Sequence, residues 1–178
     1  VEFDLTDKSV DVGVGEISVL SDGWVRCSTT WVATTASQDI YIEPMTAAGA
    51  RSYLGDGTSG IYIWGAQLEN VTNQSIQTAA DYIPTTTTAV TKWFDTAQPT
   101  VTNLLKWSED FTNAAWLKGS QTLYAVNATS APNGTTAATK IYETSSAGQH
   151  EFLQTFTPSV GAVYCATVYQ KQAERQYG

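Results

Sequence analysis

Apolar and polar residues alternate with a period of two in several short segments of this chain. Because successive side chains of a β-strand point to opposite faces of a sheet, such alternation predicts strands rather than helices. The expected strands are residues 24–32, 39–43, 60–68, 152–157 and 163–171. In the first of them, one face carries Val25, Cys27, Thr29 and Trp31, and the other carries Trp24, Arg26, Ser28, Thr30 and Val32.

Turn-forming residues separate these segments. Pro44 ends the second expected strand, the glycine-rich residues 55–60 precede the third, and residues 158–161 (PSVG) separate the last two. Glycine supplies the positive φ angles of tight turns, and proline cannot donate to a strand ladder. Short strands with turns between them predict an all-β, antiparallel sandwich. Residues 84–103 are expected to form a connector, and residues 111–117 a single helical turn.

The composition supports strands and excludes one class of partner. Charged residues make up 15% of the 178 residues, while Thr and aromatic residues, which suit a half-buried pleated surface, are abundant. The net charge is −8, and the nine Lys and Arg residues are scattered. Since phosphate binding requires clustered cations, we expect no nucleic-acid partner. The apolar runs fall far short of the roughly 18 residues of a membrane span, so we expect no membrane insertion.

The cysteine and histidine content argues against a metal cofactor of the zinc type. The chain has two cysteines, Cys27 and Cys165, and one histidine, His150, with no CxxC pair. Both cysteines lie in apolar, strand-like segments, where they are expected either as buried free thiols or as a disulfide. The sequence begins at Val1 without a signal peptide, so we expect a piece or processed product of a longer chain.

Two parts of the sequence resemble a repeated domain of tailed-phage fibre and head-spike proteins. The opening of that domain is similar to residues 103–116 (NLLKWSEDFTNAAW) and 131–138 (APNGTTAA). Its centre and close are similar to residues 23–26 (GWVR), 57–70 (GTSGIYIWGAQLEN) and 81–86 (DYIPTT). More distantly, the layout is similar to jelly-roll carbohydrate-binding modules, with residues 163–171 as their second strand. The resemblance covers nearly the whole chain and implies a jelly-roll sandwich.

The order of the resembling parts is inverted in this chain. Residues 1–92 correspond to the closing half of the sandwich, residues 93–102 to a linker, and residues 103–178 to the opening half. Three arrangements would fit: two half-domains of a tandem array, one sandwich closed within the chain, or halves completed between chains. Because an isolated half-sandwich exposes long strand edges and half a core, we expect one complete sandwich, formed within the chain or with a neighbour.

The resemblance to carbohydrate-binding modules directs attention to the aromatic residues. Flat rings stack on sugar faces, and neighbouring polar groups bind the hydroxyls. Trp31, Tyr41 and Tyr53 are the candidates for an exposed glycan platform, and Arg26 is a candidate polar contact beside Trp24. The remaining large aromatics are expected to pack inside the protein. Tyr62 and Trp64, for instance, share a predicted strand face with Leu68.

Catalytic and metal sites have little support in the sequence. Asp4, Asp7 and Asp11 are expected on a solvated strand or loop, and Ser108 has no nucleophile-elbow motif and no histidine near it in sequence. We therefore expect no enzyme. In related modules an acidic residue of the opening strand binds a structural Ca²⁺, which points to Glu109, but the chain has Trp64-Gly65 where those modules have two aspartates. No other cofactor is expected.

Two functions fit these expectations. The first is a non-catalytic structural or adhesion module of a phage virion (a fibre, spike or decoration protein) that binds host surface glycans. It would be extracellular in the virion and would assemble as a homo-oligomer or with neighbouring repeats. The alternative is a carbohydrate-binding module of a secreted bacterial polysaccharide-degrading enzyme, which would be monomeric. The inverted order favours the first, because tandem repeats are natural in a fibre.

Overall fold

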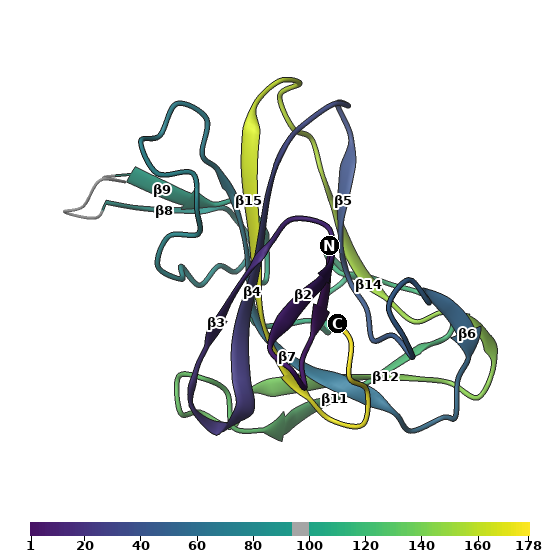
Figure 1. Cartoon of the computed structure of the whole chain (residues 1–178). Coiled ribbons are helices and arrows are strands. Elements are labelled where there is room, and N and C mark those ends of the chain that lie inside the picture. Colours follow the sequence, from purple (N-terminus) through teal and green to yellow (C-terminus); the bar gives the residue numbers. More distant parts are fainter. Residues whose placement is uncertain (94–99) are drawn as a thin grey trace.

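The computed structural model describes residues 1–93 and 100–178, and it is an all-β sandwich (Figure 1). The described residues contain fifteen strands, one 3-10 turn at Ser21–Gly23, and no α-helix. The strands are β1 Glu2–Asp4, β2 Ser9–Val12, β3 Glu16–Val19, β4 Trp24–Val32, β5 Gln38–Ile42, β6 Ser52–Leu54, β7 Gly60–Asn70, β8 Val90–Trp93, β9 Thr100–Asn103, β10 Leu117–Lys118, β11 Thr122–Thr129, β12 Ala138–Glu143, β13 Ala147–Gln149, β14 Phe152–Phe156 and β15 Val163–Gln172.

All five strands expected from the alternation are present, as β4, β5, β7, β14 and β15. The helical turn expected at residues 111–117 is not formed. Its backbone instead makes successive tight turns, in which Asn113 N–H donates to Asp110 O and Trp116 N–H donates to Asn113 O. Both turns carry an Asp or Asn whose side chain accepts from the backbone two residues on, which favours turns over helix.

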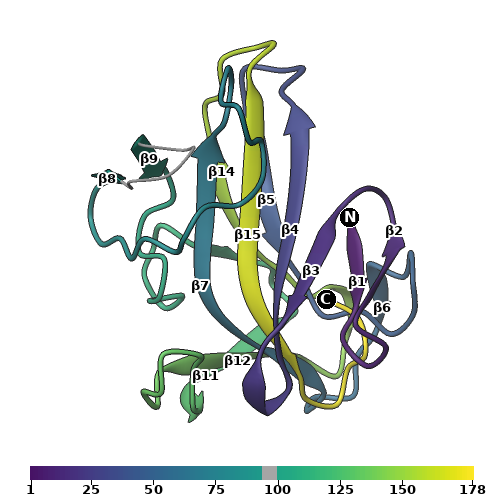
Figure 2. The ribbon, with the colours of Figure 1, turned by 60° about the vertical axis from the view of Figure 1, so that its left-hand side comes forward.

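Two antiparallel sheets face each other and enclose the main core. The larger has the order β11-β12-β7-β15-β4-β3, and the smaller has the order β10-β14-β5. In Figure 2, β7, β15 and β4 lie side by side as the long strands of the larger sheet, with β5 and β14 behind them. Three two-stranded sheets, β1-β2, β13-β6 and β8-β9, flank this sandwich.

In the larger sheet, strands from the first 92 residues are interleaved with strands from residues 103–178. β15 lies between β4 and β7, with Ala166 paired to Thr29 on one side and Leu68 on the other. The two chain ends also pair, since Phe3 and Gly178 exchange both backbone hydrogen bonds, at 3.0 and 3.1 Å. The described strands of both segments therefore share one sheet and one core.

The main core lies between the sheets, on the face of β4 that carries Val25, Cys27 and Trp31. Val25 and Cys27 are buried there, and Trp31 packs at its margin, while Trp24 belongs to a second, smaller cluster on the outer face of the larger sheet. Trp24 is fixed there by its indole N–H, which donates to Ser130 O at 3.0 Å.

A bulge in β7 overturns one expectation about the core. Gly65 and Ala66 together lie opposite Val168, because the register of β7 with β15 shifts between Tyr169–Trp64 and Thr167–Gln67. Gly65 takes φ +60°, which a glycine adopts freely and which is typical of a bulge. As a result Tyr62 and Trp64 do not share a face with Leu68 but lie in the outer cluster.

The two cysteines are buried free thiols on different faces of the larger sheet. Cys27 lies in the main core, while Cys165 pairs in register with Thr30 on the outer side. Burial raises the pKa of the Cys27 thiol well above its ordinary value and that of Cys165 to about 11. Both thiols are therefore protonated and unreactive at neutral pH.

The expected connector carries secondary structure of its own. β8 and β9 pair antiparallel, with Thr91 opposite Thr102, and form a projection beside the sandwich (Figure 1). Asn103 at the end of β9 is fully buried, and its side-chain amide donates to Ala66 O and Ile83 O. Residues 94–99 of the predicted linker lie outside the described residues.

Candidate functional site

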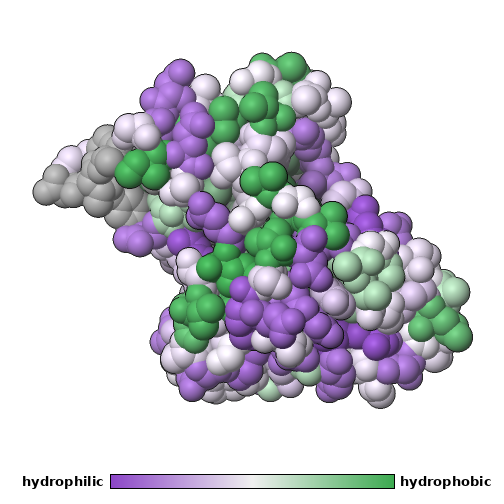
Figure 3. Space-filling model, in the orientation of Figure 1, coloured by the Kyte–Doolittle hydropathy of each residue, from purple (hydrophilic) through white to green (hydrophobic). Residues whose placement is uncertain are grey.

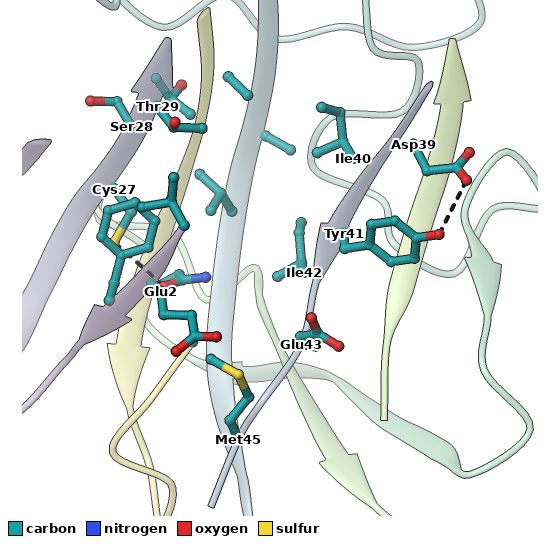
Figure 4. A pocket seen from close by; sticks show the side chains of 18 of the residues that line it. Glu2, Cys27, Ser28, Thr29, Asp39, Ile40, Tyr41, Ile42, Glu43 and Met45 are labelled. Carbon is teal, nitrogen blue, oxygen red and sulfur yellow. Dashed lines mark hydrogen bonds between the residues drawn. The ribbon is translucent and has the colours of Figure 1, made fainter. Parts of the chain in front are cut away.

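A cleft of about 430 Å³ opens on one side of the sandwich, between β5 and β1 (Figure 4). Its floor is the inner face of the larger sheet, with Cys27 from β4 and Ala166 and Val168 from β15. One wall is β5, the edge strand of the smaller sheet. Glu2 and Phe3 of β1 form the other. Apolar side chains also gather across the middle of this face of the molecule (Figure 3).

The side chains of β5 point to two sides of that wall. In Figure 4, Ile40 and Ile42 point toward the side of the cleft that holds Cys27, whereas Asp39 and Tyr41 point the opposite way. The period of two that predicted this strand produces the division. β5 thus lines the cleft with apolar side chains on its inner face and with Asp39, Tyr41 and Glu43 on its other face.

The outer surface of β5 is built around Tyr41, whose ring is 44% exposed. The guanidinium carbon of Arg51 lies 5.0 Å from the ring centroid, so the two flat groups form one plate. The Tyr41 hydroxyl donates to Asp39 Oδ2 at 3.2 Å, and Asp39 Oδ1 accepts from Thr155 Oγ1 at 2.6 Å. Partial burial and the Asp39 carboxylate raise the pKa of Tyr41, which keeps the phenol protonated. We call Asp39, Tyr41, Glu43 and Arg51 the β5 platform.

Two carboxylates hold Arg51 in place. Its Nε donates to Glu43 Oε1 at 2.5 Å, and its Nη2 lies 3.9 Å from Glu151 Oε2. Burial raises the pKa of Glu43, although the hydrogen bond from Arg51 opposes this, and Glu151 nearby adds to the rise. Glu43 Oε2 is buried and accepts no hydrogen bond. The platform therefore has more negative than positive charge and unused hydrogen-bonding capacity.

The four residues expected to bind glycan are spread over three places, because Tyr41 and Trp31 both line the cleft. Tyr41 lies on the β5 platform, and Trp31 lines the inner end of the cleft, where its indole N–H donates to Gln38 Oε1 at 3.0 Å. Arg26 lies on the outer face of the larger sheet, 5.5 Å from the Tyr169 ring centroid, and donates to Thr167 Oγ1.

Tyr53 is taken up by a buried polar cluster instead of an exposed surface. Its hydroxyl lies 2.9 Å from both Pro44 O and Glu143 Oε2, and its ring packs at 4.6 Å on His150. Glu143 is fully buried, and Arg175 donates to both of its carboxylate oxygens. The structure thus leaves Tyr41 as the exposed member of the expected set.

The residues considered for catalysis and metal binding do not converge. Ser108 is buried, its hydroxyl lies 2.8 Å from Tyr82 Oη, and it accepts from Thr85 N–H. His150 is buried elsewhere, with its ring nitrogens near Gln121 O and Tyr53 O. Within residues 1–93 and 100–178, no three His, Cys, Asp or Glu side chains cluster as a metal site would need, at Glu109 or elsewhere.

Three residues of the platform were not among the sequence candidates. Asp39 and Glu43 share a strand face with Tyr41 in the alternation of residues 39–43, so that pattern held the signal for both. Arg51 comes from the loop between β5 and β6, where no periodic pattern indicates which way a side chain points.

Comparison of the chain with protein-family models, curated proteins and solved structures found no match in any of the three. In the part of the chain that the structure describes, no helix is long and apolar enough to cross a membrane. The geometry of the site therefore carries the functional argument.

Proposed function

We propose that this chain is a non-catalytic β-sandwich module of a phage virion fibre, spike or decoration protein, and that its β5 platform binds a host surface glycan. The observation that carries the glycan proposal is the exposed Tyr41 ring stacked beside Arg51, with the Asp39 carboxylate at the ring's edge. A flat ring excludes water from the face of a sugar, and carboxylate and guanidinium groups bind its hydroxyls.

The state of the cysteines supports the virion over the alternative, a module of a secreted bacterial polysaccharide-degrading enzyme. Secreted domains are commonly stabilised by disulfides, whereas Cys27 and Cys165 are free thiols on different faces of one sheet. In that sheet β15 of the second segment lies between β4 and β7 of the first, which supports one sandwich as the folded unit.

A glycan array, followed by titration of the best ligand, tests the proposal. We expect Tyr41→Ala to lower affinity at least about fivefold, because an aromatic stack contributes roughly 1–3 kcal/mol. The matched control is Tyr124→Ala on β11, since that ring is 39% exposed and also has a cation, Lys118, at 5.2 Å. No binding to any glycan, or equal losses in both variants, would refute glycan recognition by the platform.

A further inference from the structure

The outer face of the smaller sheet carries an apolar band that continues from Tyr41. The register pairs Tyr41 with Leu153 and Leu153 with Leu117, so these three side chains lie in one row across β5, β14 and β10. Tyr41 is 44% exposed and Leu117 56%, and Leu153 between them is half-buried. Leu153 and Leu117 lie beyond the residues that line the cleft. Because neighbouring strands lie about 4.8 Å apart, the band extends the platform by about 10 Å, away from the cleft.

Carboxylates flank this apolar band on both sides. Asp39 lies on one side, in the exposed pair that β5 makes with β14 there. On the other side, the same register continued by one residue beyond Ile42 brings Glu43 opposite Glu151. The Glu151 carboxylate also contributes to the raised pKa of Glu43, as a close like charge does. Like charges directly opposite each other destabilise a sheet, so this pair of glutamates calls for a cation.

Arg51 meets that requirement only in part. Its Nε donates to Glu43 Oε1 at 2.5 Å, but its Nη2 lies 3.9 Å from Glu151 Oε2, which is too far for a hydrogen bond. The Oε2 atoms of both glutamates are buried without a donor, and 12% of each side chain remains exposed toward a ligand. The three strands add no cation on this face, because Lys118 of β10 lies on the other side, near the Phe152 ring. Three carboxylates therefore surround the band with one guanidinium.

We propose that the glycan recognised here is built of amino sugars with free, protonated amines, which stack on the apolar band and place an ammonium group at the Glu43–Glu151 pair. An ammonium group has three N–H donors and no acceptor, so it supplies both the positive charge and the donors that the pair lacks. A glycan with carboxylate or sulfate groups would instead meet like charge. This assignment rests on the proposed function, because it names the class of glycan for the same platform.

The probes are the β-1,4-linked tetramers of glucosamine and of N-acetylglucosamine, each titrated into the full chain by calorimetry at about pH 6. The two share a backbone and ring faces, and acetylation removes the charge of the amine. We expect the glucosamine tetramer to bind at least about tenfold more tightly. Raising NaCl from about 0.05 to 0.5 M should reduce that preference, because salt screens exposed charges.

The outcomes separate this inference from the proposed function. If the N-acetylated tetramer, or a neutral or acidic glycan of the array, binds as well or better and Tyr41→Ala weakens it, the platform binds glycan and the amino-sugar class is wrong. If no glycan binds at all, both proposals fail. Spermine at equal amine concentration should compete at least about tenfold less well, because it has no ring face. Equal competition would make the pair a general cation site and would overturn the proposal.

A charge variant tests the glutamate pair directly. Glu151→Gln keeps the size of the side chain and removes its charge, so we expect about fivefold weaker binding of the glucosamine tetramer and unchanged binding of the N-acetylated one. The matched control is Glu16→Gln on β3, which removes the same charge from an exposed strand of the larger sheet and should change neither affinity. Equal losses in both variants would mean that the net charge of −8, and not this pair, attracts the amine, and would overturn the proposal.

Discussion

The same three residue types, Tyr, Arg and Glu, meet at two places in this molecule with different results. On the β5 platform, Arg51 lies over Tyr41 and binds Glu43; in the buried cluster, Arg175 lies 5.5 Å from the Tyr53 ring centroid and binds Glu143. The Arg51 side chain is 43% exposed, and that of Arg175 19%. Chemistry alone does not distinguish these two sites, but their environment does.

The decisive difference is how completely each carboxylate is satisfied. Glu143 is fully buried, and its carboxylate accepts hydrogen bonds from Arg175 and from the Asp56 N–H at 2.8 Å. The Tyr53 hydroxyl donates to its Oε2 at 2.9 Å. Glu43 accepts from Arg51 and leaves Oε2 without a donor. A cluster whose hydrogen-bond acceptors all have donors within the protein stabilises the fold and has no free acceptor for a ligand. A cluster with an unused acceptor beside an exposed ring is available for binding.

Breaking the saturated cluster should have the largest effect. Arg175→Met leaves Glu143 as a buried charge without its ion-pair partner, so we expect a loss of about 3–5 kcal/mol in the free energy of unfolding. Arg51→Met, the same change in the exposed cluster, should cost within about 1 kcal/mol. Urea denaturation measures both. Similar losses in the free energy of unfolding for the two variants would show that the completeness of hydrogen bonding does not distinguish the two clusters.

The tyrosine hydroxyls provide a smaller version of the same contrast. Tyr53→Phe removes a donor that lies between Pro44 O and Glu143 Oε2, and we expect it to cost about 1–2 kcal/mol. Tyr41→Phe removes a single hydrogen bond to exposed Asp39 and should change stability by no more than about 0.5 kcal/mol. Both rings stay in place, so thermal melts of the two variants isolate the hydroxyl contribution. A larger loss for Tyr41→Phe would contradict the assignment of roles.

Alternation is a local property, and it predicted five of the fifteen described strands; the other ten are mostly shorter and were not predicted. The alternation divided β4 into two faces, but it did not show which face is inner: Val25 and Cys27 are buried in the main core, and Trp31 on the same face packs against it. The bulge at Gly65 was not readable, because nothing in the alternation of residues 60–68 shows that two residues oppose one on β15. The extra residue of the bulge reverses which side of the sheet the residues before it face, so Tyr62 and Trp64 lie in the outer cluster and Leu68 in the main core.

The candidate site was only partly predictable, because burial depends on residues distant in the chain. Tyr41 and Tyr53 were both candidates for an exposed platform, although only Tyr41 lies in a predicted strand. Tyr53 is enclosed by Glu143, 90 residues further on, whereas Tyr41 has no such cover. Arg51 reaches Tyr41 from a loop, and loop side chains follow no period.

The third prediction, with the smallest effect, is that removing one carboxylate from each cluster changes the stability at pH 7 in opposite directions. The hydroxyl and N–H of Ser59 and the N–H of Thr58 lower the pKa of Asp56, which neighbours Arg175; its ionisation therefore stabilises the fold above its unfolded-state pKa, and that stability is lost as pH falls. Burial raises the pKa of Glu43, so its ionisation opposes folding as pH rises through the folded-state value. We expect Asp56→Asn to be less stable than the parent at pH 7 and Glu43→Gln to be slightly more stable. Urea midpoints from pH 3 to pH 7 should show both differences shrinking toward acid, and differences of the same sign would mean that the clusters do not differ in this way.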